Sequence, residues 1–289
     1  MSRGLWLGIL TNILGGTSYV LVKLGLSSWP PATLVLVRSL LAWPVFALIA
    51  PRGGLKDATR ADWVRMILVG SIGSAAPNMI GTFALTQTGS LNAGLLVGLE
   101  PVTIVVASAL FLREPLRGGQ VLGFLTALFG AAVVVAHGDA AALLRFDGET
   151  LPNLMLAIHA MLWATYTLLA KPTLERVPAA TFSAVTSAIA IGCVTPFAAT
   201  EWSGLVVEEV LNPRAILLIV AMGVGISALA VILWNMALTT LKATEMAPLV
   251  FIQPVAAACL SLLIGESAGW TVFVGGALVL AGVFMAERN

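Results

Sequence analysis

Uninterrupted apolar stretches of about twenty residues recur from one end of the chain to the other. An α-helix rises about 1.5 Å per residue, so each stretch is long enough to cross the ~30 Å hydrocarbon core of a bilayer. Backbone polar groups in lipid must be paired within the spanning structure, and long runs without alternation fit helices rather than the strands of a barrel. The sequence therefore predicts an all-α membrane protein.

The composition leads to the same prediction. Of the 289 residues, 59% are hydrophobic and 10% are charged, whereas soluble domains are about half apolar and about a quarter charged. No water-soluble fold can bury that much apolar surface, so we expect the lipid bilayer to be the solvent. The net charge of +1 gives no indication of a nucleic-acid partner.

Charged residues, prolines and glycines divide the apolar sequence into ten predicted spans. The spans are Gly4–Leu26, Pro31–Ala50, Trp63–Leu85, Leu91–Leu112, Gly119–Ala136, Leu151–Leu169, Ala179–Thr200, Ile216–Leu238, Thr244–Ile264 and Trp270–Ala286. If the N-terminus is cytoplasmic, Lys and Arg concentrate in the connections on that side, and the opposite side keeps Lys23, Arg145 and Arg214. The positive-inside rule then predicts a multi-pass protein with both termini in the cytoplasm.

The two halves of the chain resemble each other in two registers. Leu96–Val102 aligns with Leu249–Val255 without a gap, and Ala84–Thr86 aligns with Ala237–Thr239 in the same register. A second register, nearer the start of each half, pairs Thr17, Lys23 and Pro30 with Thr165, Lys171 and Pro178. We expect a five-helix repeat in residues 1–140, an extracytoplasmic linker in 141–150 and a second repeat in 151–289. Five is an odd number, so the second repeat enters the membrane from the opposite side, and in such inverted duplications the substrate site lies near the midplane.

The segment Phe83–Pro101, continuing to Glu114, resembles the EamA-type signature of the drug/metabolite transporter superfamily, and Trp234–Glu266 resembles its second copy. Within that superfamily the chain is most similar to the YddG-type amino acid exporters. The resemblance implies a transporter in a bacterial inner membrane that exports small metabolites, chiefly aromatic and other neutral amino acids, by alternating access. Glu100 differs from the family pattern, in which an uncharged residue is more ordinary before the proline.

Glu100 lies near the middle of its predicted span, where an ionisable group costs at least ~2.5 kcal/mol. It either contacts a substrate amine or carries a proton, or it is a neutral acid hydrogen-bonded to a neighbouring helix. Gln253, its counterpart in the second half, suits an interhelical hydrogen bond. Pro101 and Pro254 each remove a backbone donor in mid-helix, which predicts either a hinge beside the cavity or a static kink.

His159, Trp163 and Tyr166 are spaced i, i+4, i+7 and therefore share one helix face. This face forms either a cavity wall for an amino acid with an apolar body or a packed aromatic stripe. The predicted substrate-binding set is completed by polar and aromatic residues of other spans. These are Asn12, Tyr19, Asn78, Thr82, Trp234 and Asn235.

Arg38 lies within the second span and has Thr186 as its counterpart. It could bind a substrate carboxylate, but snorkelling to the interface or pairing with an acidic residue is the more usual fate of such a side chain. We therefore leave it out of the predicted site.

Other functional classes find less support in the sequence. There is no HExxH, no GxSxG, no Cys/His cluster and no phosphate-binding glycine loop, so we predict neither an enzyme nor a metal or cofactor site. A drug or lipophilic cation is the closest alternative substrate, because it would also use Glu100 and the aromatic face. A channel is the remaining rival, and oligomeric state is not predicted.

Overall fold

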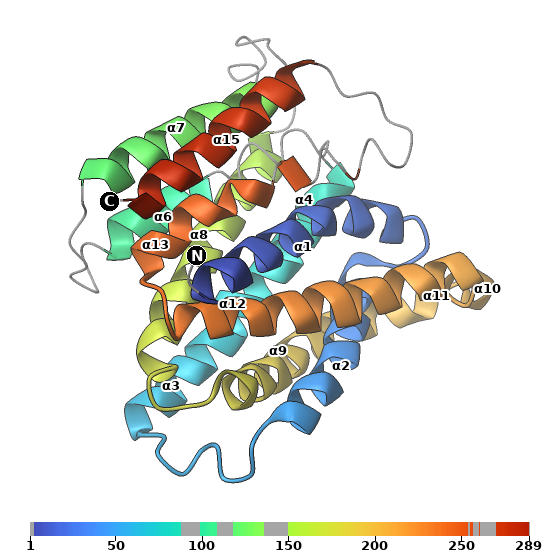
Figure 1. Cartoon of the computed structure of the whole chain (residues 1–289). Coiled ribbons are helices and arrows are strands. Elements are labelled where there is room, and N and C mark those ends of the chain that lie inside the picture. The colour runs from blue at the N-terminus through green and yellow to red at the C-terminus, as the bar shows by residue number, and fades with distance from the viewer. Residues whose placement is uncertain are drawn as a thin grey trace.

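The computed structural model describes residues 3–87, 99–108, 118–135, 150–253, 255–256, 260 and 270–288. All of the described secondary structure is helical (Figure 1). The earlier elements are α1 (Arg3–Gly25), α2 (Pro31–Ile49), α3 (Arg60–Leu68), the π-helical η1 (Val69–Ala75), α4 (Ala76–Gln87), α6 (Leu99–Ala107) and α7 (Gly118–Val135). The later ones are α8 (Thr150–Thr173), α9 (Ala179–Glu201), the short 3₁₀ turn η4 (Trp202–Gly204), α10 (Val207–Val210), α11 (Pro213–Val220), the π-helical η5 (Ala221–Ala230), α12 (Val231–Leu238), α13 (Ala243–Val250) and α15 (Trp270–Arg288).

Within the described part of the chain, six helical stretches are long and apolar enough to cross a membrane. They are Arg3–Gly25, Pro31–Ile49, Arg60–Gln87, Leu154–Thr173, Ala179–Gly204 and Pro213–Leu238, which correspond to the first three and the sixth to eighth predicted spans. Helices α7 and α15 coincide with the predicted fifth and tenth spans. The fourth and ninth spans lie partly outside the described residues, so the count of ten stays a prediction.

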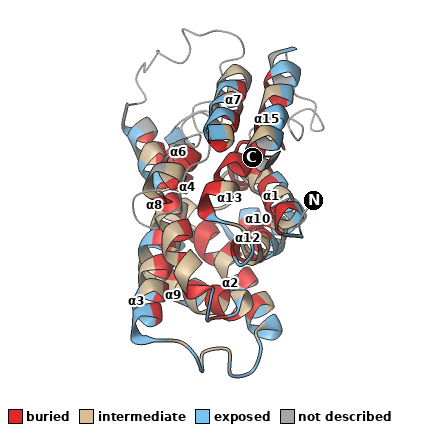
Figure 2. Cartoon of the chain, turned by 60° about the vertical axis from the view of Figure 1, so that its left-hand side comes forward, coloured by how far each residue is buried: buried red, intermediate tan, exposed pale blue. Residues whose placement is uncertain are grey.

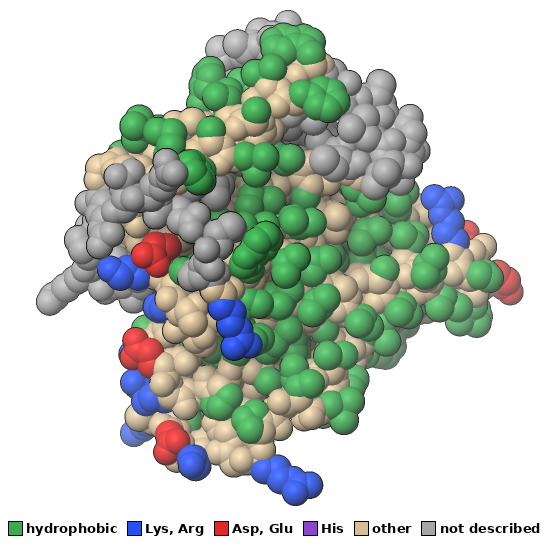
Figure 3. Space-filling view, in the orientation of Figure 1, with side chains coloured by type: hydrophobic (Ala, Val, Ile, Leu, Met, Phe, Trp, Pro, Cys, Tyr) green, Lys and Arg blue, Asp and Glu red, His purple; other side chains and the backbone are tan. Residues whose placement is uncertain are grey.

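The exterior of the bundle is apolar, as lipid requires. In Figure 2, buried residues lie mainly where the helices pack together and exposed residues lie mainly on their outer sides. Large side chains such as Leu48 and Phe273 are mostly exposed. Hydrophobic side chains also cover much of the face in Figure 3, where Lys and Arg gather toward the end of the molecule at which α3 begins.

Helices α2 and α9 pack against each other in opposite directions. At the start of α2, the backbone N–H groups of Ala32 and Thr33 donate to the carboxylate of Glu201, at the end of α9, over 3.0 and 2.8 Å. At the other end, Gly54, just beyond α2, lies against the side chain of Thr181 at the start of α9. The register that pairs Lys23 with Lys171 also pairs these two helices, so counterparts in the two halves lie antiparallel.

Helices α7 and α15 form a second pair of counterparts and lie side by side at one edge of the bundle, next to α13 (Figure 1). A β-carbon at Gly282 of α15 would lie 2.5 Å from the backbone oxygen of Gly123 and the backbone nitrogen of Ala127 in α7. Only glycine permits that approach, as is common where membrane helices cross closely.

The third span of each half contains a π-helical segment that the sequence did not reveal. Segment η1 joins α3 to α4, and η5 joins α11 to α12. The register that pairs Leu85 with Leu238 also aligns η1 with η5. Wider turns of this kind occur frequently at functional sites, so their recurrence directs attention to the region that they border.

Two lysines make equivalent contacts at opposite ends of the bundle. Lys23 Nζ donates to the carbonyl of Leu85 over 2.9 Å, and Lys171 Nζ donates to those of Leu238 and Leu241 over 2.6 Å each. Gly4 lies against Thr240, near the Lys171 contact. Lys23 therefore lies at the far end of α1, whose 23 residues extend about 34 Å.

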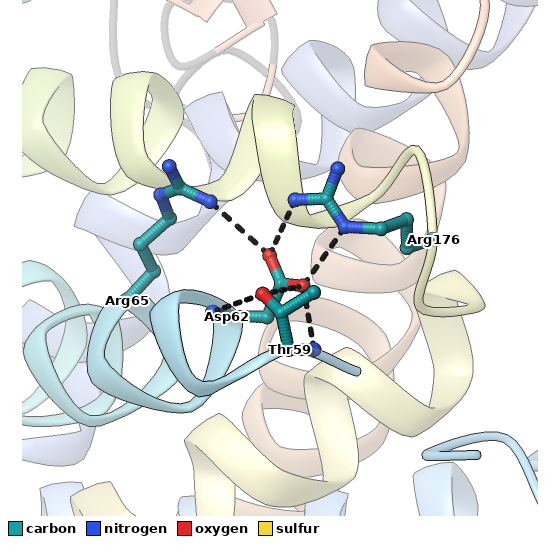
Figure 4. Close-up of polar contacts among 4 residues, drawn as sticks. All are labelled: Thr59, Asp62, Arg65 and Arg176. Carbon is teal, nitrogen blue, oxygen red and sulfur yellow. Dashed lines mark hydrogen bonds and ion pairs between the residues drawn. The ribbon is translucent and has the colours of Figure 1, made fainter. Parts of the chain in front are cut away.

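A buried carboxylate joins α3 to the connection between α8 and α9 (Figure 4). Asp62 is fully buried and accepts hydrogen bonds from Thr59 N, from Thr59 Oγ1 and from Arg65, over 3.0, 2.7 and 3.2 Å. Arg176 binds it with two nitrogens, at 2.9 and 2.8 Å. The hydrogen bonds that Arg176 donates to Asp62 raise the pKa of its guanidinium.

Replacement of Asp62 by alanine should destabilise the protein. It removes the shared acceptor of two arginines and of the α3 cap, at a cost on the order of 2–4 kcal/mol. We expect a lower melting temperature for Asp62→Ala in detergent, measured by intrinsic fluorescence, and little change for the exposed control Asp57→Ala. Equal melting temperatures for both variants would contradict this role of Asp62.

Candidate functional site

A cavity of about 170 Å³ lies inside the bundle and is lined from both halves of the chain. Helices α1, α2, α4 and α6 contribute residues to its wall, as do α8, α9, η5 and α12. A water molecule occupies about 30 Å³ in the liquid, so the cavity has the size of a small metabolite rather than of a lipid.

All of the predicted substrate-binding residues except Asn235 line this one cavity. They are Asn12, Tyr19, Asn78, Thr82, Glu100, His159, Trp163, Tyr166, Trp234 and Gln253. The structure thus brings together residues from spans far apart in sequence, although their role in binding stays a prediction.

Asn235 is not among the residues that line the cavity, and its part in substrate binding stays a prediction. It is fully buried, and its side-chain nitrogen is 2.8 Å from Tyr166 Oη and 2.9 Å from Ser183 Oγ. The Tyr166 hydroxyl is also 3.1 Å from Asn235 Oδ1. Because α12 turns this side chain toward α8 and α9, Asn235 positions Tyr166 rather than facing the cavity.

The predicted hinge prolines are only partly described. Pro101 is buried within α6, two residues after the point where the description of that helix begins. Pro254 lies outside the described residues. A hinge at these positions therefore stays a prediction.

The aromatic face of α8 is both a cavity wall and a packed stripe. The rings of Trp163 and Tyr166 have centroids 5.4 Å apart, and Tyr166 meets Phe182 edge-on at 6.2 Å. His159 Nδ1 lies 2.7 Å from the carbonyl oxygen of Pro77. Since a carbonyl only accepts, Nδ1 carries the proton, and the ring is fixed against α4.

A chain of side-chain hydrogen bonds links α1 to the residues after α13. Gln253 donates to Asn12 Oδ1 over 2.9 Å and accepts from the Tyr19 hydroxyl over 3.4 Å. Asn12 in turn donates to the Gly8 carbonyl over 2.7 Å. Gln253 thus makes the interhelical bonds that its sequence position suggests, while part of its side chain still faces the cavity.

Glu100 is buried and faces the same cavity. Among the described residues, no side chain or backbone group donates a hydrogen bond to it, and none forms an ion pair with it. The described part of the chain therefore offers no hydrogen-bonding partner of the kind expected for a purely structural acid.

Arg38 is a charged cavity residue that the sequence prediction left out of the site. It is buried and lines the cavity, with one guanidinium nitrogen donating to Asn78 Oδ1 over 2.5 Å. It does not snorkel, because α2 packs against α9 on one side and against η5 on another, which encloses the side chain. Within the described ranges it pairs with no acid.

Positions that are equivalent in the two halves face the cavity together. The pairs are Thr11 and His159, Gly15 and Trp163, Ser18 and Tyr166, Arg38 and Thr186, Ser39 and Ser187, Ala42 and Ala190, Ser74 and Ser227, Asn78 and Val231, Gly81 and Trp234, and Glu100 and Gln253. Even a backbone contact repeats, because Thr11 donates to the Ala230 carbonyl over 2.6 Å as His159 does to that of Pro77. The cavity is therefore built jointly by matched elements of the two halves.

The described residues contain no group of three or more His, Cys, Asp and Glu side chains that could hold a metal ion. What the cavity offers instead is one cationic side chain, one carboxyl group, several amides and hydroxyls, and aromatic rings. Such a set binds and orients a small polar molecule.

The sequence profile of the EamA-like transporter family matches residues 2–136 and again residues 150–287. The chain belongs to this family. As an EamA-like transporter, it is a membrane protein with a small-molecule substrate, and its two matches cover nearly the whole sequence.

Curated relatives of similar length agree with this assignment. An "Uncharacterized transporter" of Archaeoglobus fulgidus is 24% identical, over 97% of this chain and 96% of its own length. A "Probable terminal-alkyne amino-acid exporter" of Streptantibioticus cattleyicolor is 25% identical, over 100% of this chain and 95% of its own length. A solved crystal structure shares the fold, with a TM-score of 0.79 and 23% identity over 100% of this chain and 97% of the other.

A substitution at Gly81 tests how closely α4 and α8 pack beside the cavity of this EamA-like transporter. A β-carbon at Gly81 would lie 2.5 Å from His159 Nδ1, whereas one at Gly192 in α9 would meet nothing within 4 Å. We expect Gly81→Ala to displace His159 and to cost about 1–3 kcal/mol, lowering the melting temperature. Gly192→Ala should not lower it, and an equal effect of both substitutions would contradict the described packing.

Proposed function

We propose that this EamA-like transporter exports neutral amino acids from the cytoplasm across a bacterial inner membrane, by alternating access to the central cavity. The observation that supports this function is the set of side chains that line the cavity. Arg38 and Glu100 face the cavity without a described ion-pair partner. Trp163 and Tyr166 also line it, and their rings pack against each other. A neutral amino acid carries a carboxylate, an ammonium group and an apolar body, and so matches each of these features.

The named relative from Streptantibioticus cattleyicolor adds independent support. Its printed name describes an exporter of amino acids with a terminal alkyne. That name suggests both the substrate class and the outward direction for the present chain, although the two sequences are only 25% identical.

A lipophilic cation is the alternative substrate that Glu100 and the aromatic wall would accept. Arg38 weighs against it, because a cation in this cavity would be repelled by the guanidinium at short range and in a medium of low polarity. The same transport assay separates the two substrates.

The proposed topology is an inverted duplication with repeats in residues 1–140 and 151–289. It is supported by the antiparallel packing of the counterpart helices α2 and α9. Both termini are proposed to be cytoplasmic, because the end of the bundle where α1 begins also carries Arg60, Arg65, Arg176 and Lys242.

Transport by purified protein in proteoliposomes tests the function directly. Liposomes loaded with unlabelled amino acid should accumulate labelled phenylalanine or leucine in a saturable manner, with and without a pH gradient as parallel arms. Liposomes without protein and proteoliposomes with the Trp163→Ala variant serve as controls, and both should take up less labelled amino acid. Uptake of cations alone would overturn the substrate class, and single-channel currents in place of saturable uptake would overturn the carrier mechanism.

The matched lysine contacts provide a candidate for the two gates of alternating access. One closes the third span against α1 at one end, and the other closes the corresponding span against α8 at the opposite end. Opening the cavity to one side requires the contact at that side to separate while the other persists.

Cysteine accessibility tests these gates. In a Cys193→Ser, Cys259→Ser background, the cavity position Ser227→Cys would be labelled by an impermeant maleimide added on either side of the membrane. Lys23→Met should increase labelling from the outer side, and Lys171→Met should increase it from the cytoplasmic side. If both substitutions increase labelling from the same side, or if neither changes it, the lysines are not gates.

A further inference from the structure

The two halves contribute unequal chemistry to a cavity that they build from equivalent positions. Where the lining is symmetric, small residues match, as in Ser39 and Ser187 or Ser74 and Ser227. The differences between the halves are therefore informative, because each shows a position at which one half carries a group that the architecture itself does not require.

Among the described residues, both charged side chains that line the cavity come from the first half. Arg38 has Thr186 as its counterpart, and Glu100 has Gln253. Only 8% of Arg38 and 6% of Glu100 is exposed. A buried charge without a partner costs several kcal/mol, so the presence of both side chains in one cavity needs a compensating interaction.

The protein supplies little of that compensation within the described residues. A guanidinium has five N–H donors, and Arg38 uses one of them on Asn78 Oδ1. Glu100 accepts no hydrogen bond from a described residue, and the two groups do not form an ion pair with each other. The cavity thus presents a cation and a carboxyl group that are separately available to a ligand.

The larger ring systems come mainly from the second half. In the alignment of the two halves, Trp163 is the counterpart of Gly15, Tyr166 of Ser18, and Trp234 of Gly81. The first half contributes Tyr19 and Phe46 to the lining, and the hydroxyl of Tyr19 is engaged by Gln253.

We propose that the halves divide the recognition of substrate between them, an inference that rests on the proposed amino acid substrate. The first half binds the charged head of the amino acid, with Arg38 on the carboxylate and Glu100 on the ammonium group. The second half binds the side chain, against Trp163 and its neighbours. Arg38 favours a carboxylate because its planar fork can donate two parallel hydrogen bonds, and aromatic rings suit an apolar side chain through offset and edge-on packing.

The repeat supplies natural test substitutions, because each charge can be replaced by the residue at its counterpart position. Binding to the purified full chain in detergent is measured by calorimetry with phenylalanine, with phenethylamine, which lacks the carboxylate, and with 3-phenylpropanoate, which lacks the amine. Arg38→Thr should weaken phenylalanine and 3-phenylpropanoate at least about tenfold. It should not weaken phenethylamine, because the guanidinium repels that cation in the native protein. Glu100→Gln should weaken the two amines and spare 3-phenylpropanoate.

The second half is tested with side-chain size as the variable. Trp163→Ala should reduce the preference for phenylalanine over alanine and leave the discrimination between phenylalanine and phenethylamine unchanged. Matched controls are the exposed positions Arg214→Thr, Glu208→Gln and Trp270→Ala, all of which should bind as the native protein does. Gel filtration and melting temperature check folding, and Arg38→Lys retains the charge if Arg38→Thr does not fold; it should keep the carboxylate preference.

Failure of this division and failure of the proposed function give different results. If phenylalanine is transported but Arg38→Thr weakens phenethylamine as much as phenylalanine, the division is wrong and the function stands. If no amino acid is transported while the three probes bind and the variants respond as expected, the function is wrong and the recognition pattern stands. If the native protein binds none of the probes, the division is overturned as well.

Discussion

Polar groups inside a lipid-embedded bundle must find their partners within the protein, because the surrounding hydrocarbon offers none. This constraint explains the arrangement of the interior. Asn12, Gln253 and Tyr19 bond to one another, and His159 and Thr11 each use a backbone carbonyl of the other half. Among the described residues that line the cavity, the two with a charged side chain are Arg38 and Glu100.

Helices packed against their own counterparts hold this interior together. Helices α7 and α15 cross closely outside the cavity lining. The antiparallel contacts of α2 with α9 bring equivalent residues of both helices to one cavity. The repeated π-helical segments η1 and η5 lie in the same region and bring Ser74 and Ser227 to its wall. A duplicated architecture of this kind gives the two halves similar shapes, so that specificity depends on the few positions at which their side chains differ.

Of the eleven side chains that sequence reasoning assigned to the site, ten line the cavity, since apolar length identified the spans and helical spacing placed His159, Trp163 and Tyr166 on one face. Sequence reasoning failed where the result depended on packing between helices. Periodicity cannot show that the side chain of Asn235 bonds to Tyr166. It also cannot show that other helices pack against α2, so that the Arg38 side chain stays buried and does not snorkel. The π-helical turns were also missed, because no residue pattern in Val69–Ala75 or Ala221–Ala230 distinguishes them from ordinary helix. Two sequence features could have identified Arg38 as a site residue. They are its depth within the span and the neutral residue Thr186 at its counterpart position.

The measurement that bears most directly on recognition by this EamA-like transporter is an experimental structure with phenylalanine bound, determined by cryo-electron microscopy in a lipid nanodisc. The expected density lies in the central cavity, with the carboxylate at Arg38, the ammonium group toward Glu100 and the ring against Trp163 on the wall of the second half. An amino acid bound in the reverse orientation, or bound outside this cavity, would contradict the division of recognition between the two halves.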